Sequence, residues 1–64
     1  MLIISRKELK NYVGKKYILL LRASMDELID IMNELDRLAP DQYQPLGDIH
    51  YGIFYDWVVM RKVD

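Results

Sequence analysis

The stretch SMDELIDIMNELDRL, residues 24–38, predicts the main helix of the fold. Ser24 is a favourable N-cap residue, and Glu27 completes a capping box in which the Ser24 hydroxyl oxygen accepts a hydrogen bond from the Glu27 N–H. Pro40 ends the helix, because proline removes a backbone donor and clashes with the preceding turn. We therefore expect a helix over residues 25–38.

One face of this helix is apolar. Its apolar residues recur at three- and four-residue spacing, which places them on one stripe: Met25, Leu28, Ile29, Met32, Leu35 and Leu38. Three carboxylates line up away from that stripe: Asp26, Asp30 and Glu34. A solvated helix face is the simpler interpretation of these acids, and a protein-interaction surface is the alternative.

Strands are expected on both sides of the helix. The run at residues 16–22 predicts a strand with both faces buried. Residues 44–50 and 53–62 predict two further strands, and the Tyr51-Gly52 step predicts the tight turn between them, since glycine tolerates a positive φ.

That turn sets the pairing within the predicted hairpin. It places His50 opposite Ile53 and Leu46 opposite Trp57. Pro45 cannot donate to a ladder, so the first of the two strands is expected at an edge.

The N-terminal segment is open to two interpretations. Residues 5–8 form a second capping box and Gly14 is a natural residue after a helix end, so a strand at 2–4 followed by a helix at 6–13 is expected. The alternative is a strand that runs to Tyr12.

The elements together predict an α+β fold. We expect a small antiparallel sheet of about three to four strands packed on one main helix, with an additional short N-terminal strand or helix. The chain, residues 1–64, forms one domain. Residues 16–62 form its core, and residues 1–15 look like an N-terminal addition.

A domain of this size has little core of its own. Below roughly 70–80 residues one core rarely supplies more than about 3–5 kcal/mol. The chain has no cysteine and a single histidine, which excludes disulfides and thiolate zinc sites. One helix cannot cover both faces of an apolar sheet, and large exposed apolar patches are uncommon on monomers. We therefore expect a homo-oligomer.

Charge is distributed unevenly along the chain. Residues 1–22 have six basic residues against one acid, whereas residues 23–56 have eight acids against one base. This asymmetry suits self-association or a basic surface for an anion. The overall excess of acid argues against double-stranded DNA as a partner. The apolar run at residues 17–21 is too short for a bilayer, and the first residues lack the order of a signal peptide, so no membrane association and a cytoplasmic location are expected.

Catalytic chemistry is not indicated. The two serines, Ser5 and Ser24, serve as helix caps, there is no cysteine or threonine nucleophile, and the glycines form no phosphate loop. We expect no enzyme activity, no metal and no cofactor.

Aromatic and basic residues around the hairpin suggest a binding role. Trp, Tyr and Arg are enriched at binding hot spots and can also stack on nucleobases while a cation holds phosphate. The alternative is that Tyr55 and Trp57 are core residues. The candidate ligand-binding residues are Tyr55, Trp57, Arg61, Arg22, Lys62 and His50.

Four segments also carry a resemblance. They are Asp26-Glu27-Leu28, Asn33-Glu34-Leu35, Tyr43-Gln44-Pro45-Leu46-Gly47 and Val59-Met60-Arg61-Lys62. In this pattern the chain resembles a family of short bacterial and phage domains of unknown function. The resemblance implies a strand–helix–strand–strand core and an association with mobile elements, and it implies no catalytic residue.

Three functions remain open at this point. The first is a small oligomeric binding protein, of phage origin, that sequesters an anionic nucleotide-type signalling ligand as an anti-defence protein. The second is a protein inhibitor that masks a host enzyme through the acids Asp26, Asp30 and Glu34 or through a free sheet edge. The third is a structural module alone.

Overall fold

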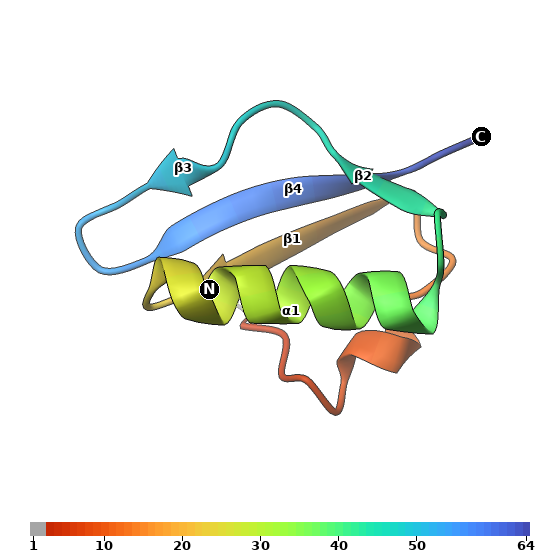
Figure 1. Ribbon diagram of the computed structural model, residues 1–64, viewed down its shortest axis with the longest axis horizontal. Helices are drawn as coiled ribbons and strands as arrows, with labels where there is room; N and C mark the ends of the chain where they lie inside the picture. Colours follow the sequence, from red (N-terminus) through yellow and green to blue (C-terminus); the bar gives the residue numbers. More distant parts are fainter. Residues whose placement is uncertain (1–2) are drawn as a thin grey trace.

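Helix α1 spans Met25–Leu38, the predicted bounds. The computed structural model describes residues 3–64, in which α1 lies across one face of a four-stranded antiparallel sheet (Figure 1). The Glu27 N–H donates to Ser24 Oγ at 3.3 Å, so the cap forms as the sequence indicates. The α+β class is confirmed.

Strand β4 lies in the middle of the sheet. Its neighbours are β1 on one side and both β2 and β3 on the other, all antiparallel to it. The bounds are Tyr17–Arg22 for β1, Tyr43–Pro45 for β2, His50–Tyr51 for β3 and Asp56–Lys62 for β4. No helix within residues 3–64 is long and apolar enough to cross a membrane.

The hairpin turn lies two residues later than predicted. His50 pairs with Trp57, and the Gly52 N–H donates to the Tyr55 carbonyl at 2.8 Å, so Ile53 and Phe54 form the loop. The predicted pairings of His50 with Ile53 and of Leu46 with Trp57 are therefore wrong. A Cβ at residue 52 would lie 2.5 Å from the Tyr55 carbonyl oxygen. Glycine is thus required at residue 52 because its backbone lies close to the Tyr55 carbonyl beside the turn. It is not required for a positive φ within the turn.

The strand predicted at residues 44–50 is interrupted. Pro45 pairs with Met60 whereas His50 pairs with Trp57, so four residues on one side span two on the other. The extra residues leave the ladder around Gly47, whose φ of 79° is the left-handed conformation that favours glycine. Two short strands, β2 and β3, therefore replace one long strand.

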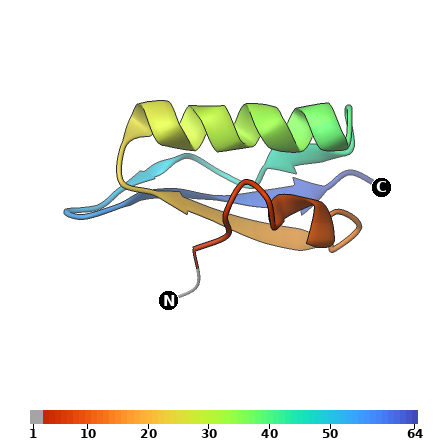
Figure 2. The same cartoon turned by 90° about the horizontal axis from the view of Figure 1, so that it is seen from below.

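The N-terminal segment is less regular than expected. Within residues 3–15 the only helix is the 3-10 helix η1 at Leu9–Asn11, between turns, in place of a helix over 6–13. Residue 2 lies outside the described residues, and residues 3–4 are not in a strand. Ser5 does act as a cap, since its Oγ accepts from the Glu8 N–H at 3.2 Å. Figure 2 shows this segment beside β1.

The hydrophobic core lies between the sheet and α1. Leu9 and Ile4 belong to it, so the N-terminal segment closes the core on the β1 side and is not an addition to a finished domain. The helix stripe is also shifted, because Ile31 is buried while Ile29 is 46% exposed. The buried members of the core are Ile4, Leu9, Ile18, Leu20, Leu28, Ile31, Leu35, Val58 and Met60.

Candidate functional site

The sheet face opposite α1 carries apolar side chains that the described chain does not cover. Side chains alternate between faces along a strand. Because Ile18 and Leu20 point into the core, the odd-numbered residues of β1 lie on the opposite face. In register across β1 and β4, this bare face pairs Tyr17 with Arg61, Leu19 with Val59, and Leu21 with Trp57.

Exposure confirms that this face is open. Tyr17 is 50% exposed and Leu19 is 40% exposed, whereas Leu21 is buried but does not belong to the core cluster. The prediction that this strand is buried on both faces is therefore wrong at Tyr17 and Leu19 and confirmed at Leu21. No helix or strand within residues 3–64 covers the bare face, because α1 packs on the other side and the N-terminal segment runs along the edge of the sheet at β1 (Figure 2).

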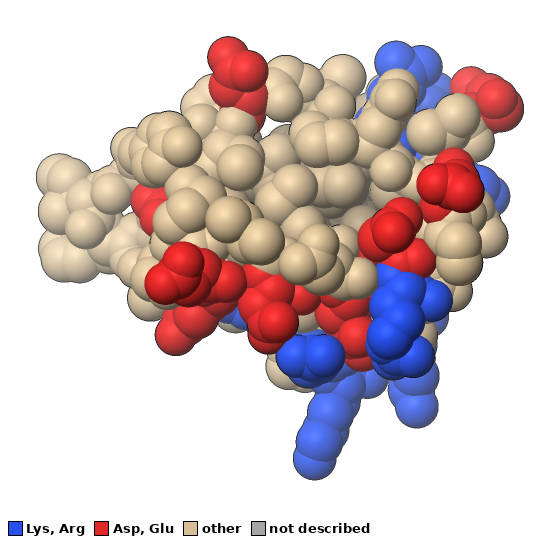
Figure 3. Space-filling model, viewed as in Figure 1, with Lys and Arg blue, Asp and Glu red and all other residues tan. Residues whose placement is uncertain are grey.

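The hairpin loop extends the apolar surface beyond the sheet. Ile53 is 95% exposed, Phe54 77% and Tyr51 75%. The hairpin projects past the N-terminal end of α1, and the space-filling view shows this end as an uncharged protrusion (Figures 1 and 3). Because a two-residue loop is normally built from Gly, Asn or Asp, large apolar residues at this tip are unusual.

His50 and Trp57 form the one stacked aromatic pair of residues 3–64. Their ring centroids lie 3.9 Å apart with an interplanar angle of 8°. They are directly paired across β3 and β4, so they share the bare face.

The other candidate ligand residues do not gather around this stack. Arg61 lies on the same face at the far end of β4, and Tyr55 lies beside the hairpin loop. Arg22 and Lys62 occupy even-numbered strand positions, which lie on the α1 side of the sheet and not on the bare face. The Arg22 guanidinium donates to the carbonyls of Leu21 at 2.8 Å and Ile4 at 2.7 Å, and so ties the N-terminal segment to β1.

The three acidic candidates differ in their surroundings. Asp26 is exposed in the first turn of α1, whereas Asp30 accepts a 2.9 Å hydrogen bond from Arg6. Glu34 is only 7% exposed, although its position away from the apolar stripe predicted a solvated side chain.

Glu34 is held by two arginines. Arg37 donates from Nε at 2.6 Å and from Nη2 at 2.8 Å, and Arg6 donates at 3.4 Å. The hydrogen bonds from Arg37 lower the pKa of Glu34 from 4.5 to about 2, with the charges of both arginines acting in the same direction against desolvation. Glu34 therefore links α1 to the N-terminal segment as a carboxylate.

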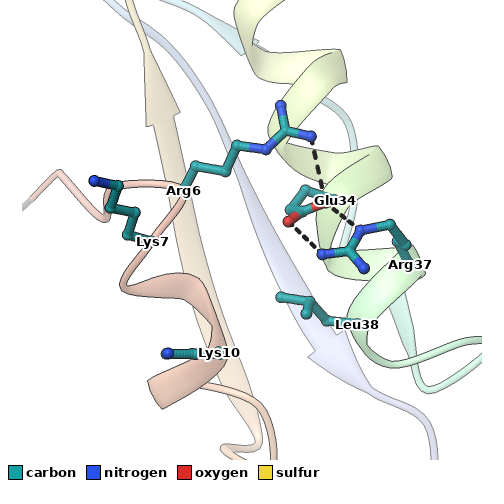
Figure 4. A pocket seen from close by; sticks show the side chains of 6 residues that line it. All are labelled: Arg6, Lys7, Lys10, Glu34, Arg37 and Leu38. Carbon is teal, nitrogen blue, oxygen red and sulfur yellow. Dashed lines mark hydrogen bonds and ion pairs between the residues drawn. The ribbon is translucent and has the colours of Figure 1, made fainter.

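A shallow basic groove surrounds this carboxylate (Figure 4). Its volume is about 510 Å³, and it lies between the N-terminal segment and the last turns of α1. The sequence signalled only an excess of basic residues in 1–22 and did not identify the groove. Its lining consists of Arg6, Lys7, Lys10, Glu34, Arg37 and Leu38.

Comparison with known proteins adds no relative: no protein-family model matches the chain, and neither does any curated protein or solved structure.

Proposed function

We propose that the chain is a non-enzymatic binding module that assembles with a second copy of itself through the bare face of its sheet. The observation that carries this proposal is the exposure of Leu19 and Tyr17 on the sheet face opposite α1, together with the exposed hairpin tip. Apolar surface of this kind is stabilised by removal from water, at roughly 25 cal/mol per Å².

The size of the face indicates which residues the interface needs. β1, β4 and the interrupted row of β2 and β3 beside them define a patch of about 14 by 20 Å, at about 4.8 Å per strand and about 3.3 Å per residue. Because protruding side chains enlarge the accessible area of the flat patch, it buries on the order of 500 Å² per copy. This is less than the roughly 800 Å² per partner of a standard interface. A buried aromatic side chain adds about 150–250 Å². Phe54 at the hairpin tip therefore belongs to the proposed interface, whereas Tyr51 pairs with Asp56 and lies on the α1 side of the sheet.

A second copy of the chain is electrostatically compatible with this surface. The chain has a net charge of −1, so two copies meet with little overall repulsion. Arg61 is the only charged residue among the paired positions of β1 and β4 on the bare face. A two-fold arrangement would bring the same apolar patch together from both copies, as in most closed homodimers.

The acidic face of α1 is a less favourable interaction surface for a protein partner than the bare face. Asp30 and Glu34 are already paired with Arg6 and Arg37 inside the chain. A partner that recognised these carboxylates would have to compete with those bonds. The bare face has no such internal competitor among the described residues.

Two matched variants test the proposal. Leu19→Glu places a charge in the middle of the bare face, and Ile29→Glu places the same charge on the outer side of α1 at similar exposure, 46% against 40%. Circular dichroism should show that Leu19→Glu is folded. Sedimentation velocity should show that Leu19→Glu is a monomer and that Ile29→Glu still assembles. Equal assembly of both variants would refute the bare face as the interface.

A further inference from the structure

We infer that the basic groove between the N-terminal segment and α1 binds the phosphate groups of a small anionic molecule. The groove lies on the α1 side of the protein, so the proposed assembly through the bare face leaves it open. This inference therefore does not depend on self-association.

Charge in the groove is strongly one-sided. Four of its six lining residues are cations and one is a carboxylate, and Asp30 beside the groove pairs with Arg6, which together gives a local charge of +2 in a chain whose net charge is −1. The last turn of α1 adds the negative end of the helix dipole, about half a charge. The cations outweigh that contribution, so the potential in the groove favours an anion.

Glu34 orients the two guanidinium groups. Each guanidinium has five N–H groups. Arg37 uses two of them on Glu34, and Arg6 uses one on Glu34 and one on Asp30, which leaves three on each. The bonds to a carboxylate that is only 7% exposed hold both groups at the groove without consuming their capacity for a ligand. Guanidinium forks match the oxygens of phosphate better than a point charge does.

Two lysines complete the set of donors. Lys7 and Lys10 line the groove from the N-terminal segment, and neither takes part in an ion pair among residues 3–64. Figure 4 shows them on the side of the groove opposite Arg37. In this view both ammonium groups point away from Arg37, so an anion in the groove would receive donors from both segments once the flexible lysine side chains turn inward.

The shape of the groove indicates the class of ligand. Its volume of about 510 Å³ falls in the range of small-molecule sites, roughly 300–1,000 Å³. Leu38 is its single apolar residue, but the aliphatic stems of the arginines and lysines make most of the lining surface apolar around the charged groups. A chain of two or three phosphate groups fits the charged groups, either as an inorganic polyphosphate or as part of a nucleotide whose remaining atoms contact the apolar lining.

Calorimetric titration at low ionic strength tests the inference, with inorganic triphosphate, ATP and adenosine as probes. We expect triphosphate and ATP to bind and adenosine to give no heat. Similar affinity for the two binding probes would identify the phosphates alone as the ligand. Tighter binding of ATP would identify a nucleotide. In both cases added salt should weaken binding, because exposed charges are screened.

A pair of double variants locates the site. Lys7→Ala with Lys10→Ala removes two exposed cations from the groove and should weaken triphosphate binding by about tenfold or more, since each charge-assisted contact is lost. Lys15→Ala with Lys16→Ala makes the same change in net charge outside the groove and should leave the affinity nearly unchanged. Absence of triphosphate binding to the unaltered chain, or an equal loss in both variants, would overturn the inference.

Discussion

His50 stacks on Trp57 across β3 and β4 with 3.9 Å between ring centroids. The stack occurs in a register in which Ile53 and Phe54 form the exposed loop. It also places the only tryptophan of the chain on the bare face. Trp57 fluorescence is therefore a natural reporter of that face.

Loss of the stack should weaken the hairpin. His50→Ala removes a cross-strand partner, and such pairs contribute roughly 0.2–1 kcal/mol. We expect a slightly lower thermal midpoint and a Trp57 emission maximum shifted to longer wavelength, as the indole gains water. Tyr51→Ala, a change in the same strand at a residue 75% exposed, is the control. The same emission shift in both variants would contradict a specific role for the stack.

The N-terminal segment should be essential for the fold. Leu9 is fully buried in the core, and Leu→Ala changes at such sites cost about 2–5 kcal/mol. A domain of this size has about 3–5 kcal/mol in total, so Leu9→Ala should leave much of the chain unfolded in urea titrations monitored by circular dichroism. Lys10→Ala, at the exposed neighbour, should behave like the unaltered chain. Native stability of Leu9→Ala would mean that this segment is dispensable.

Stability should depend on the ionisation of Glu34. Its pKa falls from 4.5 to about 2 on folding, so between these pH values the unfolded chain binds more protons than the folded one. The contribution of Glu34 is fully present above pH 4.5 and is lost as the pH falls toward 2.

Glu34→Gln should therefore lower the thermal midpoint at neutral pH, and its difference from the unaltered chain should shrink as the pH falls through this range. Asp48→Asn, a change at an exposed residue, should show no comparable trend. A difference that stays constant with pH would indicate that Glu34 acts through packing and not through its charge.

The hairpin tip should matter for assembly and not for folding. Ile53 and Phe54 are 95% and 77% exposed, and surface changes of this kind usually alter stability by less than about 0.5 kcal/mol. Replacement of both by serine should leave the thermal midpoint of the monomer unchanged. The concentration needed for half-assembly in sedimentation should rise by about tenfold or more, because apolar burial is lost. Unchanged assembly would place the tip outside the interface.

Local signals predicted the helix well. Ser24, Glu27 and Pro40 act within one or two turns, so the bounds of α1 follow from nearby residues. The side of the helix that faces the core was harder to predict, because Ile29 and Ile31 both fit an apolar pattern. Only the position of β1 and the N-terminal segment decides that Ile31 is buried.

Long-range relationships explain the other differences. Gly52 marks the hairpin correctly, but its role is close approach to Tyr55, which a turn rule based on positive φ does not distinguish. The basic groove joins Lys7 and Arg37, which are thirty residues apart in the sequence. The burial of Glu34 depends on the same approach of two distant segments.

Sedimentation equilibrium of the unaltered chain over a range of micromolar concentrations tests the bare face most directly, with Trp57 emission followed in the same samples. A mass that rises toward twice the 7.7 kDa of one chain, with emission shifting to shorter wavelength, is the result we predict. A mass of 7.7 kDa at every concentration, with constant emission, would contradict self-association through this surface.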